Sequence, residues 1–359
     1  MNDNTNSTND TTKLLIVGPR GTGGIDRYIT EQKRYLEDRM DVRLYTRYTA
    51  PKGEGLERAV RMILFSILAV FLFPFQSRPD IVHVHSSHKY SFYRSAFFVL
   101  YSASVWRVPV ILHIHGSSFD EFLETDSLLV RRLQSLVFDA VDDVVVLSEY
   151  WREFVSRRTD YDKVHVLANA VEPSEYEPTY QTDPVHVVFV SNLIERKGIG
   201  ELLDAIEALE TMPHLSFHVS IGGRGPFADR VEAVAAAYDN VDYLGFLSES
   251  EKQDLLGRGT VFVLPTYAEG LPIALLEGMA GGNAIVTTPV GSIPEVVTEE
   301  QGILVTPGDA EDLTQALARL IDNPDDAVRM GRANRELIES RYSWESNADN
   351  LVAMYAQAN

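Results

Sequence analysis

The sequence predicts an α/β protein of two Rossmann-like, doubly wound domains that face a central cleft. The chain has 359 residues, which is long for a single hydrophobic core, so two domains are expected. Short β-rich runs alternate with segments of helical length, which is typical of right-handed βαβ crossovers and parallel sheets. A stretch with three prolines, residues 172–184, interrupts this alternation once. Ligands of such sheets bind at the carboxyl ends of the strands, so the site is expected in the cleft.

Six strands are predicted on each side of this interruption. In the first half they are residues 13–18, 41–46, 80–86, 109–116, 142–148 and 163–169. In the second half they are residues 185–192, 215–223, 241–246, 261–266, 283–288 and 302–307. Helical segments separate the strands, and one of these helices has a predicted capping box from Ser248 to Glu251. Three further helical segments close the chain from about Asp309.

These elements define the expected domain boundaries. Residues 1–12 are almost free of apolar side chains and predict a disordered tail. We then expect an N-terminal domain over 13–171 that binds the acceptor, a linker over 172–184 and a C-terminal domain over 185–340. The last segment, 341–359, is expected to form a helix that packs back on the N-terminal domain.

Charge is distributed unevenly along the chain. The net charge is −20, yet residues 1–172 carry 21 Lys or Arg against 22 Asp or Glu, and the remaining residues carry 11 against 30. The second half thus has a net charge of −19, an acidic surface of the halophilic type. So acidic a chain is not expected to bind nucleic acid. It has no cysteine, which excludes disulfides and thiolate metal sites.

The longest apolar run, MILFSILAVFLFPF at residues 62–75, would span about 21 Å as a helix, too short to cross a bilayer. Lys52, Arg58 and Arg61 precede it, and Arg78 follows it. We interpret most of this run as a buried core helix. The alternative is an interfacial helix that docks on an anionic membrane surface. No signal peptide precedes the first strand, so we expect a cytoplasmic protein, peripheral at the inner face of the plasma membrane under the second interpretation.

The segment AEGLPIALLEGMA, residues 268–280, carries two glutamates at a predicted helix start. Glu269 lies in the loop after a strand, and Glu277 lies more than one turn into the helix. Backbone N–H groups and the helix dipole at this point favour a phosphate. A glycoside hydrolase needs its two carboxyls roughly 5–9.5 Å apart on opposite sides of the scissile bond, which this arrangement does not readily give. The pair is better interpreted as acceptors for ribose and sugar hydroxyls; the alternative is a glutamate at the helix dipole and an unrelated surface glutamate.

Arg196 and Lys197 follow a strand and open a predicted helix. They are two of only 11 cations in the acidic half, where an entering diphosphate would need local positive charge. Solvation of a helix end is the alternative interpretation. The segment GPRGTGGIDRY, residues 18–28, also follows a strand and opens a helix, so its backbone can approach a ligand closely. It is not a G-x-G-x-x-G dinucleotide motif, and a tight strand-to-helix turn would explain it equally well.

Two H-x-H pairs place imidazoles on one face of a strand, which is a possible metal arrangement. Without cysteine or a nearby set of glutamates no metal is predicted, and His83 and His113 are expected to be buried and hydrogen-bonded. At the carboxyl end of one of these strands, His88 and Lys89 are placed to face an acceptor. The five histidines concerned are His83, His85, His88, His113 and His115.

In combination, these segments resemble the family 4 retaining glycosyltransferases of the GT-B fold. The similarity covers nearly the whole chain. It rests on the glycine loop, HIHG (113–116), VVLSEYWRE (145–153), VSNLIERKG (190–198), IGGRGP (221–226), EGLPxxxxE (269–277), MAGGNAIVTTPVGSIPEVV (279–297) and YSWE (342–345). The resemblance implies a hexosyltransferase-type enzyme that uses a nucleotide-sugar donor, retains the anomeric configuration, and needs neither a metal nor another cofactor.

The resemblance also assigns roles to the glutamate motif. It implies that Glu269 contacts the hydroxyls of the donor sugar and that Glu277 holds the ribose. Backbone amides at the helix start are expected to face the donor. They belong to Gly270, Leu271 and Ile273.

For the donor diphosphate, the family uses an arginine and a lysine. Lys197 matches the lysine, whereas Asn192 occupies the position of the usual arginine. Arg196 is expected to replace the missing charge, with Arg224 as a further donor-binding cation. The resemblance further places Gly23 and Gly24 at the donor phosphates or the acceptor, and His115 at the position of an active-site histidine.

The function favoured by the full motif set is transfer of a sugar to an acceptor hydroxyl, such as that of a lipid-linked saccharide in glycan or polysaccharide biosynthesis. No enzyme nucleophile is evident, so the family implies front-face attack, with the leaving phosphate accepting the proton of the acceptor. The alternatives are a non-catalytic two-domain protein that binds a sugar or nucleotide, and a GT-B epimerase or phosphorylase.

Overall fold

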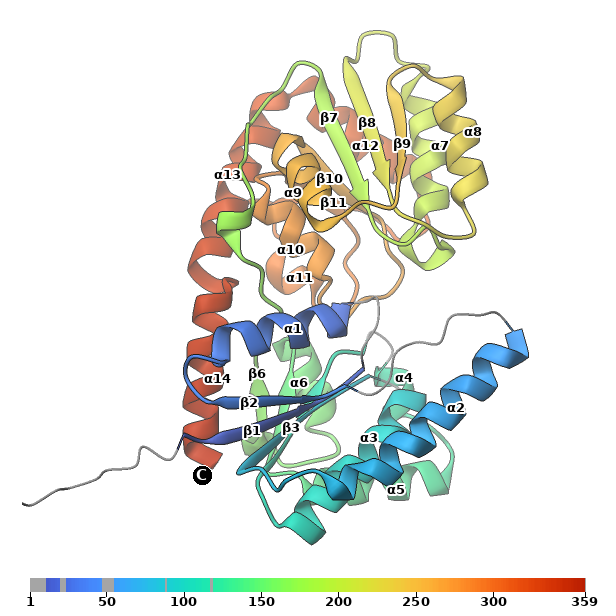
Figure 1. Ribbon diagram of the computed structural model, residues 1–359. Coiled ribbons are helices and arrows are strands. Elements are labelled where there is room, and N and C mark those ends of the chain that lie inside the picture. The colour runs from blue at the N-terminus through green and yellow to red at the C-terminus, as the bar shows by residue number, and fades with distance from the viewer. Residues whose placement is uncertain (1–10, 20–23, 47–54, 88, 117–118, 359) are drawn as a thin grey trace, which may run out of the picture.

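The computed structural model describes residues 11–19, 24–46, 55–87, 89–116 and 119–358, without the side chains of 55–59 and 62. The described chain forms two α/β domains, each built on a six-stranded parallel sheet (Figure 1). The two doubly wound domains predicted from the sequence are therefore confirmed. The predicted donor segments that begin at Gly18, Val190 and Ala268 each lie at the carboxyl end of an interior strand.

The N-terminal sheet has the strand order β2-β1-β3-β4-β5-β6. Its strands are rich in Val, Ile and Leu, because helices cover both faces of the sheet. The strands are β1 (Lys13–Val17), β2 (Asp41–Tyr45), β3 (Ile81–Ser86), β4 (Val110–Ile114), β5 (Asp143–Val146) and β6 (Val164–Val166). The helices are α1 (Gly24–Leu36), α2 (Gly55–Leu72), α3 (Tyr90–Tyr101), α4 (Phe119–Leu123), α5 (Leu128–Ala140) and α6 (Glu149–Val155).

The C-terminal sheet has the order β12-β11-β10-β7-β8-β9. Its strands are β7 (Val185–Val190), β8 (Phe217–Gly222), β9 (Val241–Gly245), β10 (Val261–Leu264), β11 (Ala284–Thr287) and β12 (Gly302–Leu304). Its helices are α7 (Ile199–Leu209), α8 (Ala228–Ala237), α9 (Glu249–Arg258), α10 (Ile273–Ala280), α11 (Ile293–Val296), α12 (Ala310–Asp322) and α13 (Pro324–Arg341). The strand order reverses between β7 and β10, and ligands of such sheets bind at this reversal.

The last helix, α14 (Trp344–Ala358), returns to the N-terminal domain. Leu351 and Tyr355 of α14 are buried in one cluster with Leu14, Ile16 and Ile29 of that domain. In Figure 1, α13 and α14 run in succession along one side of both domains. Apolar packing at the end of the chain thus ties the two domains together.

Helix α2 contains the longest apolar run of the sequence. Most of its described side chains are exposed, including Ile67 at 61% and Phe71 at 66%, and the following Phe75 is 74% exposed. Ala69 and Phe73 are the buried positions among the described residues of α2 and the turn after it. The expectation that most of this run lies in the core is therefore wrong, because α2 covers the outside of the helical layer (Figure 1). No described helix combines the length and the apolar character needed to cross a membrane.

A row of histidines lies between the N-terminal sheet and helices α1 and α14. The rings of His83 and His85 stack with centroids 4.5 Å apart and planes 2° apart. His83 Nδ1 lies 2.6 Å from the Tyr355 hydroxyl. Neither ring nitrogen of His113 has a hydrogen-bond partner among the described residues, so the expected hydrogen bonds of His113 are not found.

Three of these histidines are close enough to raise the question of a metal ion. Possible ligand atoms of His83, His85 and His113 lie within 4.8 Å of one another. However, ring lone pairs lie in the ring plane, so those of His83 and His85 lie in two parallel planes, and both ring nitrogens of His85 already have hydrogen-bond partners in His115 and Gln32. Both observations fit buried packing, and the absence of a metal stays a prediction.

The histidine row should make the protein sensitive to acid. Burial lowers the pKa of His83 and His115 to about 3, and burial lowers that of His85 and His113 well below its usual value. The unfolded chain binds protons near pH 6.5, so the free energy of unfolding falls as the pH drops below that value. Replacing His113 by Leu removes one such group and should reduce this slope by about 1 kcal/mol per pH unit between pH 6 and 5.

Urea unfolding at several pH values in this window measures the slope. The matched control is His214→Leu at an exposed position, which should keep the wild-type slope. An His113→Leu protein with the wild-type slope would show that His113 does not stay neutral in the folded chain.

Candidate active site

Two helix starts, one from each domain, meet in the cleft. Gly24 is the first residue of α1, and Ile273 is the first residue of α10. A Cβ atom added to Gly24 would lie 3.6 Å from Ile273 Cδ1. Both helix ends carry unpaired backbone N–H groups and the positive end of a helix dipole. Their meeting point therefore favours an anion held between the domains. Gly23 lies outside the described residues.

The loop before α10 lies directly against the N-terminal domain. A Cβ atom at Gly270 would be 3.1 Å from Leu147 Cδ1 and 3.2 Å from the carbonyl oxygen of His115, so only glycine allows this approach without displacement. The Leu271 carbonyl accepts a hydrogen bond of 2.6 Å from Asn169 Nδ2. Asn169 was not predicted from the sequence, since its position at the end of a predicted strand was its only distinguishing feature.

Further contacts fix the domains on the side of α6. Ser292 Oγ donates to Ser148 Oγ over 2.7 Å. The carboxylate of Glu295 accepts the backbone N–H groups of Glu149 at 3.0 Å and Tyr150 at 2.7 Å. A carboxylate from the C-terminal domain thus caps the first turn of an N-terminal helix. These residues belong to two of the quoted family segments, although their pairing could not be predicted.

Glu269 is a buried carboxylate, 7% exposed, at the carboxyl end of the C-terminal sheet. Lys197 Nζ donates to Glu269 Oε1, and Thr266 Oγ1 donates to the same oxygen at 3.1 Å. Arg196 Nη1 lies 3.6 Å from Glu269 Oε1 and donates to the Ala268 carbonyl. The structure thus brings together three of the residues predicted to act, Arg196, Lys197 and Glu269.

The position of Lys197 depends on the glycine that follows it. Gly198 has a φ of 71°, and a Cβ atom there would lie 1.9 Å from the Pro265 carbonyl oxygen. The short 3-10 turn η5 (Glu195–Lys197) can therefore lie against the end of β10 only with glycine at 198. This explains why the cation and the glutamate, 72 residues apart in sequence, are neighbours.

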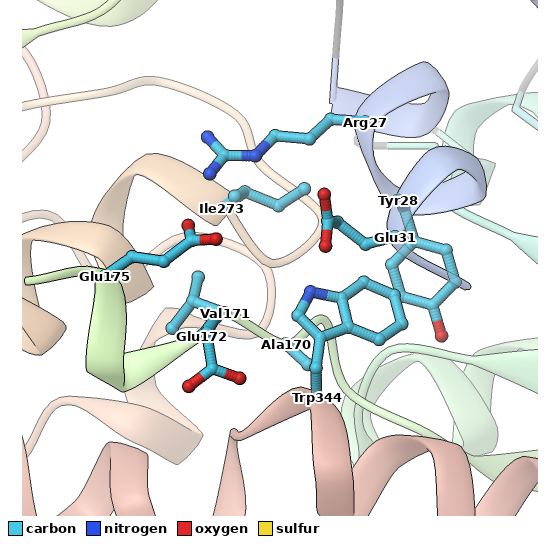
Figure 2. Close-up of a pocket in the computed structure, with 9 residues that line it drawn as sticks. All are labelled: Arg27, Tyr28, Glu31, Ala170, Val171, Glu172, Glu175, Ile273 and Trp344. Carbon is cyan, nitrogen blue, oxygen red and sulfur yellow. The ribbon is translucent and has the colours of Figure 1, made fainter. Parts of the chain in front are cut away.

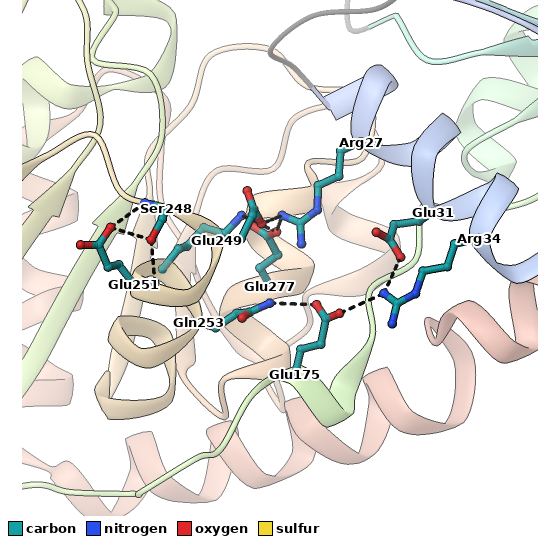
Figure 3. A network of polar contacts seen from close by, with 10 residues as sticks. Arg27, Glu31, Arg34, Glu175, Ser248, Glu249, Glu251, Gln253 and Glu277 are labelled. Atoms are coloured by element: carbon teal, nitrogen blue, oxygen red, sulfur yellow. Dashed lines mark hydrogen bonds and ion pairs between the residues drawn. The ribbon is translucent and has the colours of Figure 1, made fainter. Parts of the chain in front are cut away.

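Glu277 is 3% exposed and lies between cations from both domains. Arg27 of α1 donates to Glu277 Oε1, and Lys252 Nζ of α9 donates to the same oxygen at 2.8 Å. Glu249 lies 2.8 Å from each of these cations. Figure 3 shows Arg27 reaching from α1 across to Glu277 and Glu249. No role was predicted for Arg27 or Lys252 from the sequence.

The remaining predicted side chains form no hydrogen bond or ion pair with either glutamate among the described residues, or they lie outside these residues. Asn192 is exposed in the loop after β7. The guanidinium of Arg224 lies 4.8 Å from the ring centroid of Phe246. Lys89 is exposed just before α3, with a φ of 50°, and His88 lies outside the described residues.

His115 lies at the carboxyl end of β4, where its Nε2 atom is 2.9 Å from His85 Nδ1. Its carbonyl faces Gly270 of the glutamate motif. Because burial lowers the pKa of His115 to about 3, the ring is neutral at pH 7. It is therefore able to accept or donate a hydrogen bond there but supplies no positive charge.

A small pocket opens beside Arg27, where α1, the linker, α10 and α14 meet (Figure 2). Arg27 and Ile273 line it on one side and the indole of Trp344 on the other. Three carboxylates also border it. The lining residues are Arg27, Tyr28, Glu31, Ala170, Val171, Glu172, Glu175, Ile273 and Trp344.

Comparison with known families identifies the group to which these domains belong. A model described as Glycosyltransferase Family 4 matches residues 22–175, and one described as Glycosyl transferases group 1 matches residues 184–323. Together they cover most of the chain and divide it where the linker lies. The chain belongs to the family 4 glycosyltransferases.

Two relatives are 28% and 27% identical to the chain over the aligned residues. The chain is 28% identical over 332 residues to a phosphatidylinositol N-acetylglucosaminyltransferase subunit of Homo sapiens. This alignment covers 90% of this chain and 66% of that protein. It is 27% identical over 263 residues to MMP alpha-(1->4)-mannosyltransferase of Mycolicibacterium hassiacum. This alignment covers 72% of this chain and 61% of that protein. The chain thus spans about two thirds of the length of these relatives.

Solved structures show the same two-domain GT-B fold. Sucrose-phosphate synthase of Thermosynechococcus elongatus superposes with a TM-score of 0.78 at 18% identity, covering 96% of this chain and 98% of that one. HepE of Anabaena, in complex with UDP-glucose, superposes with a TM-score of 0.73 at 15% identity, covering 96% and 99%. The GT-B fold predicted from the sequence is therefore confirmed.

Proposed function

We propose that this glycosyltransferase binds a nucleotide-sugar between its domains and transfers the sugar to an acceptor hydroxyl. The observation that carries the proposal is the pair of buried carboxylates, Glu269 in the loop before α10 and Glu277 within α10, beside the point where α1 and α10 begin. An anion at the helix starts and hydroxyls at the two carboxylates match a nucleoside diphosphate sugar. The relatives named above as transferases, and the neighbour solved with UDP-glucose, support this donor class.

In this proposal each group at the cleft has one task. Glu277 accepts the ribose hydroxyls, and Glu269 accepts hydroxyls of the donor sugar. The backbone amides that start α10, those of Gly270, Leu271 and Ile273, face the donor. Lys197 and Arg196 stabilise the negative charge that develops on the departing diphosphate, because fixed cations in a poorly hydrated site act strongly on such charge.

We further propose that transfer retains the anomeric configuration and needs no divalent metal. The acceptor oxygen attacks the anomeric carbon on the face that the leaving group occupies, and the bond from that carbon to the diphosphate oxygen breaks. The acceptor proton passes to the departing phosphate oxygen, so no protein base is needed. The cations beside Glu269 supply the positive charge that a metal would otherwise provide. The anomeric coupling of the product by NMR, and turnover in excess EDTA, test these two statements.

A panel of nucleotide-sugars tests the donor site. One member should raise the melting temperature of the protein, because a ligand that binds only the native state stabilises it. Glu277→Ala should weaken binding of that donor about tenfold or more in calorimetry, since it removes the acceptor for the ribose. Lys197→Ala should bind the donor but lose most of its turnover. A wild-type protein that none of the panel stabilises would contradict the proposed function, and binding without turnover on any acceptor would favour a binding protein.

The acceptor side of the proposal rests on an exposed apolar surface, which we call the α2 patch. It consists of the exposed apolar residues of α2 and the turn after it, Val60, Ile63, Leu64, Phe65, Ile67, Leu68, Phe71 and Phe75. Exposed cations lie at its ends, Arg61 within the helix and Arg78 beyond it. Apolar side chains flanked by cations are suited to the surface of an anionic membrane.

We therefore propose that the N-terminal domain, which has a net charge near zero, rests on an anionic membrane and glycosylates a lipid-linked acceptor. The strongly acidic C-terminal half would be repelled from the same surface, which orients the molecule with α2 toward the lipid. The human relative is named as a transferase that acts on phosphatidylinositol, which supports a lipid acceptor.

Sedimentation with phosphatidylserine vesicles tests the membrane proposal. The wild-type protein should pellet with the vesicles. The double variant Ile67→Glu with Phe71→Glu should stay in the supernatant, because insertion of the patch would bury two carboxylates in the lipid. The matched control is Leu244→Glu, an exposed apolar position in the C-terminal domain, which should pellet as the wild type does. Equal sedimentation of the double variant and the wild type would contradict the proposal.

A further inference from the structure

Arg27 forms a charged contact between the two domains at the base of the cleft. It lies in the first turn of α1, and its guanidinium donates to Glu277 Oε1 and lies 2.8 Å from Glu249 Oε2. Burial alone would lower the pKa of Arg27, but the nearby Glu277 carboxylate raises it above its usual value. Arg27 therefore stays charged. Its side chain remains 27% exposed and borders the pocket of Figure 2, so it is not enclosed by packing.

The proposed function gives Glu277 a second partner. The carboxylate oxygen that accepts Arg27 also accepts Lys252, so little hydrogen-bonding capacity on this oxygen remains for ribose hydroxyls. Lys252 belongs to the same domain as Glu277, whereas Arg27 reaches it from the other domain. A ribose that enters this position would therefore displace Arg27 more readily than Lys252.

The diphosphate that accompanies the ribose needs a further cation. In the C-terminal domain, Lys197 and Arg196 share the charge of Glu269. Asn192, in the loop after β7, is neutral. After the charge of Glu269 is neutralised, Lys197 and Arg196 together supply less positive charge than a diphosphate carries negative charge. Arg27 lies one turn from Gly24, which adjoins Ile273, so its side chain has this point within reach.

We propose that Arg27 is a diphosphate-binding residue supplied by the N-terminal domain, and that Glu277 holds it until the ribose of the donor takes its place. The inference rests on the proposed function and adds that Arg27 exchanges Glu277 for the diphosphate when the donor binds. A planar guanidinium pairs with two phosphate oxygens as well as it pairs with a carboxylate, so the charge of Arg27 is neutralised before and after the exchange. The exchange also links donor binding to the contact between the domains, because the same side chain takes part in both.

The exchange predicts opposite effects on two ligands. Arg27→Gln should weaken binding of a nucleoside diphosphate tenfold or more, because a cation at the phosphates is lost. The same variant should bind the corresponding nucleoside as tightly as the wild type or more tightly, because the competitor for Glu277 is gone. Competition NMR with UDP and uridine, GDP and guanosine, and ADP and adenosine measures both affinities.

The matched control is Arg34→Gln on the same helix. Arg34 lies 3.3 Å from Glu175 and does not contact Glu277 among the described residues, so its loss should leave both affinities unchanged (Figure 3). Arg27→Lys keeps a charge but not the planar fork, and it should bind the diphosphate with an affinity between those of Gln and the wild type. It also serves if the Gln variant fails to fold.

Two results would overturn the inference while the proposed function stands. One is a diphosphate affinity that Arg27→Gln leaves unchanged or raises, and the other is an equal loss for nucleoside and diphosphate, which would mean that Arg27 only positions the domains. If the wild-type protein binds none of the three diphosphates, the proposed function itself fails.

Discussion

The cleft between the domains depends on the pairing of two buried carboxylates with cations that come from distant parts of the chain. Glu269 and Glu277 are each less than one tenth exposed, and an unpaired carboxylate at such a position would be strongly destabilising. Lys197 and Arg196 of the turn η5 pair with Glu269, and Arg27 of α1 and Lys252 of α9 pair with Glu277. The cations that stabilise these buried carboxylates when no donor is bound are the same cations that would bind a nucleoside diphosphate. Under the proposed function, folding stability and ligand binding would therefore rest on one set of side chains.

The arrangement of the domains follows from contacts on both sides of this charged centre. Asn169 and Ser148 bind the segments around α10 and α11, and Glu295 caps α6. On the opposite side, α14 crosses from the C-terminal domain and buries Leu351 and Tyr355 against the N-terminal sheet. Backbone and side-chain contacts thus hold the two helix starts face to face, while the central contact between Arg27 and Glu277 involves only charged side chains, which can exchange partners.

The sequence predicted the twelve strands because most are short runs rich in Val, Ile and Leu whose length and spacing match buried parallel strands. It also located Glu269 and Glu277 correctly at the start of α10, since Pro272 marks that helix start. It did not reveal Arg27, whose partner lies 250 residues away in the other domain, because local spacing carries no information on contacts between domains. Helix α2 was misjudged for a related reason: a helix that is apolar on all sides fits a core and an exposed surface equally well. His113 shows the same limit, since an H-x-H pattern predicts the face of the strand but not the partners of the ring.

The central claim is that the donor lies between the starts of α1 and α10 and contacts both domains. Hydrogen exchange followed by mass spectrometry, with and without the nucleotide-sugar that most stabilises the protein, tests it most directly. The account predicts slower exchange in residues 24–28 of the N-terminal domain and in residues 270–277 of the C-terminal domain in the same sample. Protection confined to one of these segments, or found only elsewhere in the chain, would contradict it.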